Sequence, residues 1–502
     1  MRHEGTPYAI VPPDPAGTVD SLSALGYSVE AAIADIVDNS IDAAANLIDV
    51  RFEWDGSDSY VAVSDNGVGM TGPELEAAMA LALRGPSTDR AAAELGRFGM
   101  GLKTASFSQC KVLTVWSRSN SGAESIRTWD LDEVVRTGEW RLLTQAPEAP
   151  QAQLQQYIRE IPSGSGTVVL WSGLTRIVGH DVDPDDSEAR RHFNEVVARV
   201  EEHLGMTFSR FLKARGGLSA LTIRVNGNPV VPWDPFMSAH PSTRPQPEQF
   251  LDLDGQTIRL RPYVLPPKSR LTDQEFATGA GPRGWLEQQG FYLYRNDRLI
   301  VAGSWLGLRR FRQDEKHLLA RISLDIPSGL DQHWSIDVRK ASGHPPIALR
   351  EALGRAAKAT REHARAALSA RTKVTAIRKS DEFTYVWRPE RRDGVLRLKI
   401  NWRHPLVREA TNGSNEAREQ VKALLRFMEE TVPIAALRIM FEPDSDEDYT
   451  PFAEAPGELA DMALRLYEAS ISWGLSPSAA RARLRNTPPF DEYPDLVNQV
   501  GK

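Results

Sequence analysis

The chain has 502 residues, with 60 Lys or Arg, 67 Asp or Glu and a hydrophobic content of 41%. This composition is ordinary for a globular protein of about two to four domains, whose cores need neither metals nor disulfides. The net charge of −7 excludes a uniformly basic nucleic-acid-binding surface but is compatible with a local basic groove. The single cysteine, Cys110, excludes an internal disulfide framework and favours a reducing cytoplasm. We expect no signal peptide, because the N-terminus MRHEGTPYAIVPPDP lacks an apolar core. We expect no membrane span, because no apolar run reaches ~18 residues.

Four segments differ in their patterns along the chain. Residues 1–20 are rich in proline and predict an extended N-terminal arm. Residues 21–180 mix helical and β-forming stretches and predict a mixed sheet covered by helices. Residues 181–374 predict a second α/β domain, and residues 375–502 a small mixed C-terminal domain. The predicted fold class is therefore α+β with several domains.

Within the second domain, the sequence predicts a helix over about 187–213, a β-hairpin at Asn226-Gly227 and a long helix over about 346–372. In the C-terminal domain, a turn at RPERRDG separates two predicted strands. An amphipathic helix at 415–440 is followed by a strand and by further helix at 456–484. The acidic stretch PDSDEDY, 443–449, predicts a surface loop.

The stretch AAIADIVDNSIDAAAN, residues 31–46, predicts a helix that Ser28 caps and that ends near residue 46. Asp35, Asn39 and Asp42 follow the spacing i, i+4, i+7 and share one face of that helix. An amide oxygen on this face could ligate a hard cation, and a carboxylate could orient or activate a water. Taken alone, the motif is better explained by a solvated helix face.

A second polar cluster is VAVSDNGVGM, residues 61–70, in which a predicted strand runs into Asp65. Gly67 and Gly69 would let the backbone turn sharply or approach a ligand. The Asp65 carboxylate could accept a hydrogen bond from the amino group of a base. A simple Asn-Gly turn is the alternative for this cluster alone.

The third cluster is GRFGMGLKTAS, residues 96–106, in which Gly96, Gly99 and Gly101 precede a predicted helix. Backbone N–H groups of such a loop and the start of a helix form an anion site, to which Lys103 adds a cation. The cluster lacks the Gly-Lys-Ser/Thr ending of a P-loop and does not follow a first strand, as a dinucleotide-binding loop does.

The three clusters in series resemble the motifs of the GHKL superfamily of ATPases, which includes gyrase, the ninety-kilodalton heat-shock chaperones, histidine kinases and MutL. The resemblance covers roughly residues 20–175 and implies an ATP-binding α/β sandwich, the Bergerat fold. It implies that Asn39 holds Mg²⁺, that Asp65 bonds the adenine amino group and that residues 71–95 form the ATP lid. Gly166-Thr167 matches the Gly-Thr that closes the adenine site. The residues implied to bind ATP are Asn39, Asp65, Gly67, Gly69, Met70, Gly96, Phe98, Gly99, Met100, Gly101, Leu102, Lys103 and Thr167.

One position departs from the pattern of gyrase-like and MutL-like members. Their general base is a Glu four residues before the Mg²⁺-binding Asn, and here that position is Asp35. Asp is one methylene shorter, and a displacement of about 1 Å can cost on the order of 100-fold in rate. We therefore predict a slow ATPase, with a turnover not well above ~1 s⁻¹. Asp42 and Ala43 match the end of the helix motif, where the resemblance implies a structural role.

The segments that follow, with IRVNGNPVVPWDPF, FYLYRNDRLI and LDQHWSIDVRKASGHPP in order, resemble the transducer domain of gyrase, MutL and MORC proteins. That domain has a ribosomal-protein-like fold, and a lysine on one of its loops reaches the γ-phosphate. Lys340 is the candidate for that lysine and Arg339 the second choice, whereas a surface lysine near a domain border is the alternative. Together with Gly85 and Ser87 in a compact lid, the motifs are most similar to those of MORC proteins and their bacterial relatives.

This resemblance implies an ATP-gated clamp. ATP binding would join two chains through their N-terminal arms into a homodimer that traps DNA or a partner. Separate helicase-type or nuclease-type effector subunits of an anti-phage system would complete it, since the chain carries no nuclease motif. A chaperone acting on protein clients and a scaffold that binds ATP without hydrolysing it are the alternatives. In the C-terminal domain, Trp387, Trp402 and the arginines between and after them could contact nucleic acid, or form a solvated hairpin edge. These arginines are Arg388, Arg391, Arg392 and Arg403.

Overall fold

The computed structural model forms two compact units, Met1–Leu368 and Ser369–Lys502, which we describe separately. Within the described ranges, every helix is too short or too polar to cross a membrane. Its helices and sheets agree with the predicted α+β class. The described residues are 13–24, 26–81, 101–161, 164–213, 220–308, 311–334, 344–379, 386–392, 395–411, 414–430, 456–472, 474–487, 490 and 493–501.

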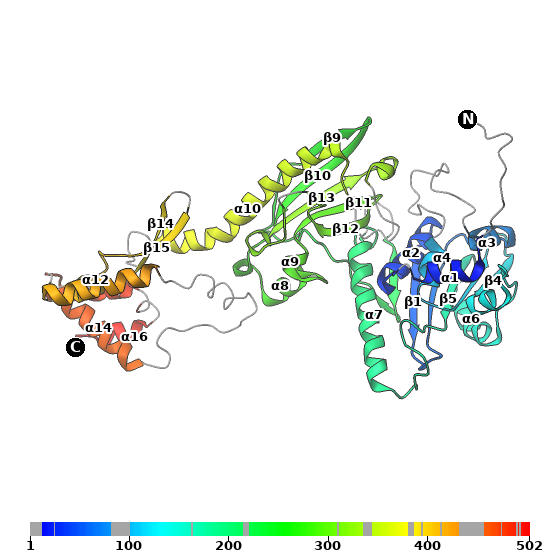
Figure 1. The fold of residues 1–502 in the computed structure, drawn as a ribbon, viewed down its shortest axis with the longest axis horizontal. Helices are drawn as coiled ribbons and strands as arrows, with labels where there is room; N and C mark the ends of the chain where they lie inside the picture. Colours follow the sequence, from blue (N-terminus) through cyan, green and yellow to red (C-terminus); the bar gives the residue numbers. More distant parts are fainter. Residues whose placement is uncertain are drawn as a thin grey trace. The chain divides into compact units, whose positions relative to one another are not determined.

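The first unit begins with a seven-stranded sheet in the order β4-β3-β5-β2-β1-β6-β7. Figure 1 labels β1, β4 and β5 of this sheet. Its neighbouring strands are antiparallel except β1 and β6, which are parallel. The predicted hairpin at Asn226-Gly227 is confirmed, since both residues have positive φ and join β6 to β7. The strands are β1 (Leu47–Glu53), β2 (Tyr60–Asp65), β3 (Val112–Arg118), β4 (Glu124–Asp130), β5 (Gly166–Ser172), β6 (Thr222–Val225) and β7 (Asn228–Pro229).

Helices cover both faces of this sheet. One face packs against most of them through a core that includes Ile33, Val37 and Val200. The opposite face packs against a single helix through Leu154 and Tyr157. The helices of the first face are α1 (Pro15–Ser23), α2 (Val29–Asp42), α3 (Gly72–Met79), α4 (Gly101–Phe107), α5 (Leu131–Thr137) and α7 (Ser187–Thr207), and the helix of the other face is α6 (Glu148–Glu160).

The N-terminal arm differs from the extended chain that its prolines predict. Residues from Pro15 onward form α1, because the Asp14 side chain caps the helix by accepting from the Gly17 N–H at 2.7 Å. Proline at the first helical position needs no N–H donor there, so Pro15 starts the helix instead of preventing it. The buried Val19 then packs α1 into the first core. Residues 1–12 lie outside the described part of the chain.

A second sheet lies in the same unit, with the order β12-β11-β13-β10-β8 and with β9 also paired to β10. One face of it packs against the long helix α10 (Ile347–Lys379), which confirms the helix predicted near 346–372. The opposite face carries an aromatic cluster that includes Phe236, Tyr292 and Tyr294. The strands are β8 (Arg244–Pro245), β9 (Gln249–Leu253), β10 (Gln256–Val264), β11 (Gly290–Arg295), β12 (Arg298–Ser304) and β13 (Ala320–Ile326). The short helices are α8 (Asp273–Ala280) and α9 (Gly284–Glu287), with 3-10 turns at Lys268–Arg270, Glu315–His317 and Ser328–Trp334.

The second unit has a two-stranded hairpin and a small helical core. The two predicted strands are confirmed, since β14 and β15 pair antiparallel. The turn predicted at RPERRDG is misplaced, because Arg388–Arg392 belong to β14, and residues 393–394 lie outside the described part of the chain. Leu459, Leu466 and Leu484 are buried in the helical core. The predicted acidic loop at 443–449 lies outside the described residues. The elements are β14 (Trp387–Arg392), β15 (Val395–Ile400), α11 (Pro405–Ala410), α12 (Asn415–Glu430), α14 (Pro456–Ser472), α15 (Pro477–Arg485) and α16 (Pro494–Gln499).

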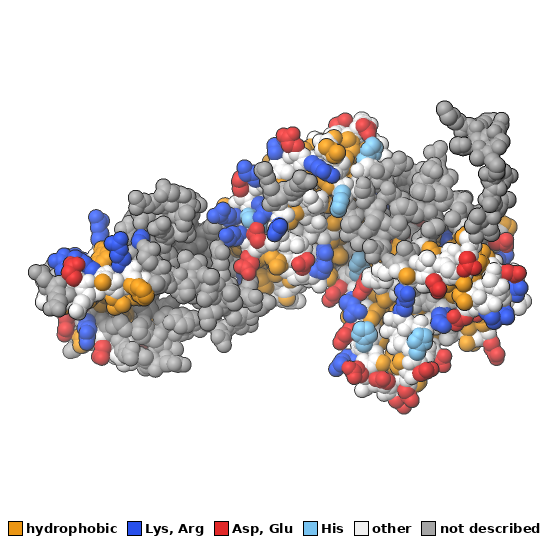
Figure 2. Space-filling model, viewed as in Figure 1, with side chains coloured by type: hydrophobic (Ala, Val, Ile, Leu, Met, Phe, Trp, Pro, Cys, Tyr) orange, Lys and Arg blue, Asp and Glu red, His pale blue; other side chains and the backbone are white. Residues whose placement is uncertain are grey.

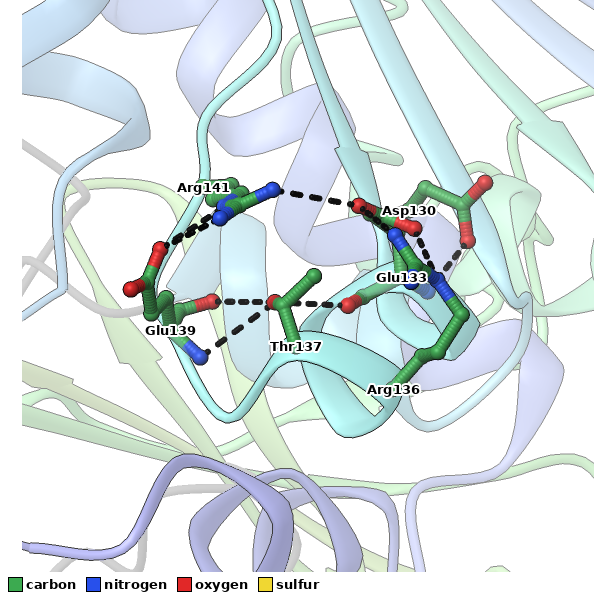
Figure 3. A network of polar contacts seen from close by, with 6 residues as sticks. All are labelled: Asp130, Glu133, Arg136, Thr137, Glu139 and Arg141. Carbon is green, nitrogen blue, oxygen red and sulfur yellow. Dashed lines mark hydrogen bonds and ion pairs between the residues drawn. The ribbon is translucent and has the colours of Figure 1, made fainter.

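Charged side chains of both signs are interspersed over the described surface that Figure 2 shows. A surface network at α5 illustrates how they pair (Figure 3). Glu133 binds Arg136 at 2.7 Å and Arg141 at 3.7 Å, and Glu139 binds Arg141 at 2.8 Å. Exposed ion pairs of this kind contribute little to stability, roughly 0–1 kcal/mol each. We therefore give this network no role beyond joining α5 to the turn that follows it.

Candidate functional site

Helix α2 places the first polar cluster at the edge of the first core. Ser28 caps it as predicted, by accepting from the Ala31 N–H at 3.3 Å. Asp35 is buried, with 6% of its surface exposed, whereas Asn39 and Asp42 are exposed. The predicted face therefore lies at the boundary between core and solvent, with a buried carboxylate one turn before an exposed amide.

Asp35 has one partner from just before α2 and one from the second sheet. One carboxylate oxygen accepts from the Tyr27 hydroxyl at 3.3 Å, and the other lies 3.5 Å from Nη2 of Arg298 on β12. Nε of the same arginine donates to Asp38, a neighbouring carboxylate on α2, at 2.6 Å. Sequence reasoning missed both Asp38 and Arg298. One sequence signal could have indicated Arg298. It directly precedes the hydrophobic strand residues Leu299 and Ile300, and an arginine that is buried with such a strand needs a partner.

Asp65 ends β2, as predicted, and it is 8% exposed. One of its carboxylate oxygens accepts from the Ser40 hydroxyl at 2.9 Å and the other from the Gly67 N–H at 2.8 Å. Burial raises the pKa of Asp65, and the hydrogen bonds from Gly67, Ser40 and Thr167 oppose that rise. The sequence did not indicate Ser40, which ties α2 directly to this carboxylate.

The turn after Asp65 fits between α2 and β3 only with glycines. A Cβ on Gly67 would lie 2.7 Å from the carbonyl oxygen of Ala43, just after α2. Gly69 has a φ of +64°, and a Cβ there would lie 1.9 Å from the carbonyl oxygen of Arg118. Both positions therefore need glycine, one for close approach and the other also for its left-handed backbone.

Thr167, on β5, lies beside the end of β2 that carries Asp65. It lies opposite Asp65 in the β2–β5 register and opposite Ser117 in the β3–β5 register. Its hydroxyl lies 2.9 Å from that of Ser117, which also accepts from the Met70 N–H at 2.8 Å. The structure thus brings together Asp65, Met70 and Thr167, three residues that the sequence named for one site.

The third cluster is described from the start of α4 onward. A Cβ on Gly101 would lie 3.9 Å from the nearer Asp35 oxygen, so the helix start adjoins α2. Leu102 is half-buried and packs against the first core. Gly96, Phe98, Gly99, Met100, Lys340 and Arg339 lie outside the described residues.

Lys103 is buried in α4, with 3% of its surface exposed. Its Nζ donates to the carbonyl oxygen of Ala78, in the last turn of α3, at 2.8 Å. Burial lowers the pKa of Lys103 to about 8. An anion bound near this amine would raise its pKa again and favour the charged form.

A separate cavity of about 360 Å³ lies at the start of α2. Its wall includes Ser28, Glu30, Arg199, His203 and Arg298. Burial, together with the nearby charge of Arg298, lowers the pKa of His203 to about 4, so this imidazole is neutral at physiological pH. Ala31, the first residue of the first cluster, lines this cavity, and the cavity shares its Arg298 wall with the Asp35 environment.

Residues 27–167 match a family model described as "Histidine kinase-, DNA gyrase B-, and HSP90-like ATPase". The matched range begins at Tyr27, a partner of Asp35, and ends at Thr167, a partner of Ser117. No curated protein matches the chain. The match supports a GHKL-type ATPase domain over the residues that the three clusters occupy.

Proposed function

We propose that the chain is an ATP-binding, slowly hydrolysing GHKL ATPase that acts as an ATP-gated switch. The observation that carries this proposal is the convergence of the three clusters. Asp35 adjoins Gly101, the Asp65 turn adjoins Ala43 at the end of α2, and Thr167 lies opposite Asp65. A wall of this kind pairs a hydrogen-bond acceptor for a base with a helix start for phosphates.

The residues take the following roles in this proposal. Asp65 accepts from the adenine amino group, against the wall of Gly67, Gly69, Met70 and Thr167. The glycine loop from Gly96 to Gly101, with Phe98, Met100, Leu102 and Lys103, holds the phosphates. Asp35 is the general base, because it is the buried carboxylate beside the helix start. Lys340 is the proposed contact to the γ-phosphate.

Mg²⁺ fits the donor set at this place. The cation that accompanies ATP takes most of its ligands from phosphate and water, and it needs only one or two protein oxygens. The exposed amide of Asn39, one turn from Asp35, supplies such an oxygen. Among the described residues, no three His, Cys, Asp or Glu side chains form a cluster that could hold a metal by themselves. When bound, Mg²⁺ would neutralise phosphate charge.

The wider proposal is a MORC-like clamp with a transducer domain at 181–374, between an ATP-binding domain at 21–180 and a C-terminal domain at 375–502. ATP would join two chains through their N-terminal arms, and DNA with separate effector subunits would complete a cytoplasmic anti-phage system. Resemblance between sequence motifs supports this part. Chaperone activity on protein clients is the alternative, and suppression of client aggregation without an effect of DNA would favour it.

Titration calorimetry with Mg-ATP tests the proposal. We expect micromolar to millimolar binding in the wild type and at least a ~10-fold loss in Asn39→Ala, since charge-assisted contacts contribute roughly 1.5–3 kcal/mol. Ser121→Ala is the control and should bind normally, because Ser121 lies in the turn between β3 and β4, where its hydroxyl contacts that of Ser119 at 2.8 Å. A wild-type chain that does not bind ATP would contradict the proposal.

A further inference from the structure

Arg298 is held at a fixed place by the hairpin that joins β11 to β12. Asn296 and Asp297, at the tip, both have positive φ, and Arg295 pairs with Arg298 across the turn. This tight turn sets where β12 begins and where its first side chain points. Arg210, after α7, binds Asp297 at 3.1 Å and so fixes the tip to the end of that helix.

The Arg298 guanidinium is shared between two carboxylates of α2. Its Nε donates to both oxygens of Asp38, at 2.6 and 2.7 Å, and its Nη2 lies 3.5 Å from Asp35. Its Nη1 donates to the carbonyl oxygen of Leu299 at 3.2 Å, and the group lies 5.7 Å from the ring centre of Phe208. The side chain is 4% exposed, so these contacts are made away from water.

The two carboxylates need a cation between them. Asp35 and Asp38 are three residues apart on one helix, and their side chains are 7% and 2% exposed. Like charges at this spacing repel each other, and burial increases the cost of an unpaired charge. Arg298 offsets both effects, and its short contacts with Asp38 fix the position from which it faces Asp35.

We propose that Arg298 is a positioning residue for ATP hydrolysis. Arg298 orients the Asp35 carboxylate, and Asp38 holds the Arg298 guanidinium in place. This inference rests on the proposed function, in which Asp35 is the general base. It makes the second sheet part of the reaction site, because Arg298 belongs to β12. A planar guanidinium can reach two carboxylates at once, which a lysine ammonium cannot do in the same geometry.

The test compares three variants by turnover number, KM and ATP dissociation constant. Arg298→Met leaves two buried carboxylates without their cation and could fail to fold. The double variant Asp38→Leu, Arg298→Met removes the main buried pair together and is expected to fold. We expect its turnover number to fall ~10- to 100-fold while the dissociation constant for ATP changes less than ~3-fold, since positioning is lost and binding is kept. Arg298→Lys should retain an intermediate turnover number.

Arg199→Met is the matched control. Arg199 also binds α2, through Glu30 at 2.9 Å, but it is half-exposed and does not contact Asp35. We expect its turnover number to equal that of the wild type. If Arg298→Lys or the double variant also keeps the wild-type turnover number, the inference is wrong and the proposed function stands. A wild-type chain that neither binds nor hydrolyses ATP would instead refute the proposed function itself.

Discussion

Asp65 and Asp35 are both buried carboxylates of the candidate site, but their partners come from different distances along the chain. Asp65 accepts from Gly67, two residues away, and from Ser40, 25 residues away, all within the first sheet and its helices. Asp35 lies beside Arg298, 263 residues away and on the second sheet. The proposed base-recognition end is thus built from the first sheet and its helices, whereas the proposed reaction end also depends on the second sheet.

The largest effect is expected from a substitution that disrupts only the Asp65 end of the candidate site. In Gly69→Ala, the added Cβ would lie 1.9 Å from a backbone oxygen that cannot move freely, at a φ of +64°. We expect a loss of roughly 3–5 kcal/mol in the free energy of unfolding, and no ATP binding at millimolar ATP. Gly122→Ala is the control, because Gly122 also has a positive φ but has open space around it. It should cost only about 1–2 kcal/mol by chemical denaturation. Equal losses in the two variants would contradict the argument from close approach.

A smaller effect is expected from removing the Asp65 carboxylate. Asp65→Ala leaves the Ser40 hydroxyl and the Gly67 N–H without their acceptor and removes the proposed contact to adenine. We expect ATP affinity to fall ~10- to 100-fold, the equivalent of roughly 1–3 kcal/mol. Titration calorimetry with ATP and with inorganic triphosphate separates the two ends, since triphosphate binding should change little. A parallel loss for both ligands would mean that Asp65 does not act on the base.

The raised pKa of Asp65 gives a pH dependence of stability. The folded chain holds the Asp65 proton more tightly than the unfolded chain does, so this group favours folding as the pH falls through its raised pKa toward the ordinary value of 3.8. The free energy of unfolding of the wild type, minus that of Asp65→Asn, should therefore increase as the pH is lowered from neutral toward about 4. Denaturant titrations at several pH values measure this difference. A difference that is constant or decreases would contradict the assigned cause.

The smallest expected effect concerns Lys103. With a pKa of about 8, this amine is partly neutral at mildly alkaline pH, and a nearby phosphate would favour its charged form. ATP binding at a pH of about 8.5 should therefore take up on the order of half a proton. Calorimetry in buffers of different ionisation enthalpy detects this uptake, which Lys103→Met should abolish. Binding enthalpies that do not depend on the buffer would place the phosphates away from Lys103.

The same contrast explains what the sequence could predict. The clusters at Asp65 and Gly101 were found because each is local, and a strand end or helix start fixes its geometry within a few residues. Helix α2 was predicted to end near residue 46, but it ends at Asp42 because Val68 in the Asp65 turn donates to the Ala43 carbonyl at 2.9 Å. Arg298 could not be paired with Asp38 from the sequence, since only the packing of the second sheet against α2 brings them together.

Turnover and ATP affinity of the wild type and Asp35→Asn, measured side by side, test the central claim most directly. We predict a wild-type turnover number at or below ~1 s⁻¹ that falls at least ~100-fold in Asp35→Asn, because the amide cannot accept the proton of the attacking water. The ATP dissociation constant should stay within ~3-fold, since Asp35 is not assigned to ATP binding. An Asp35→Asn variant that hydrolyses ATP at the wild-type rate would contradict the assignment of Asp35 as the base.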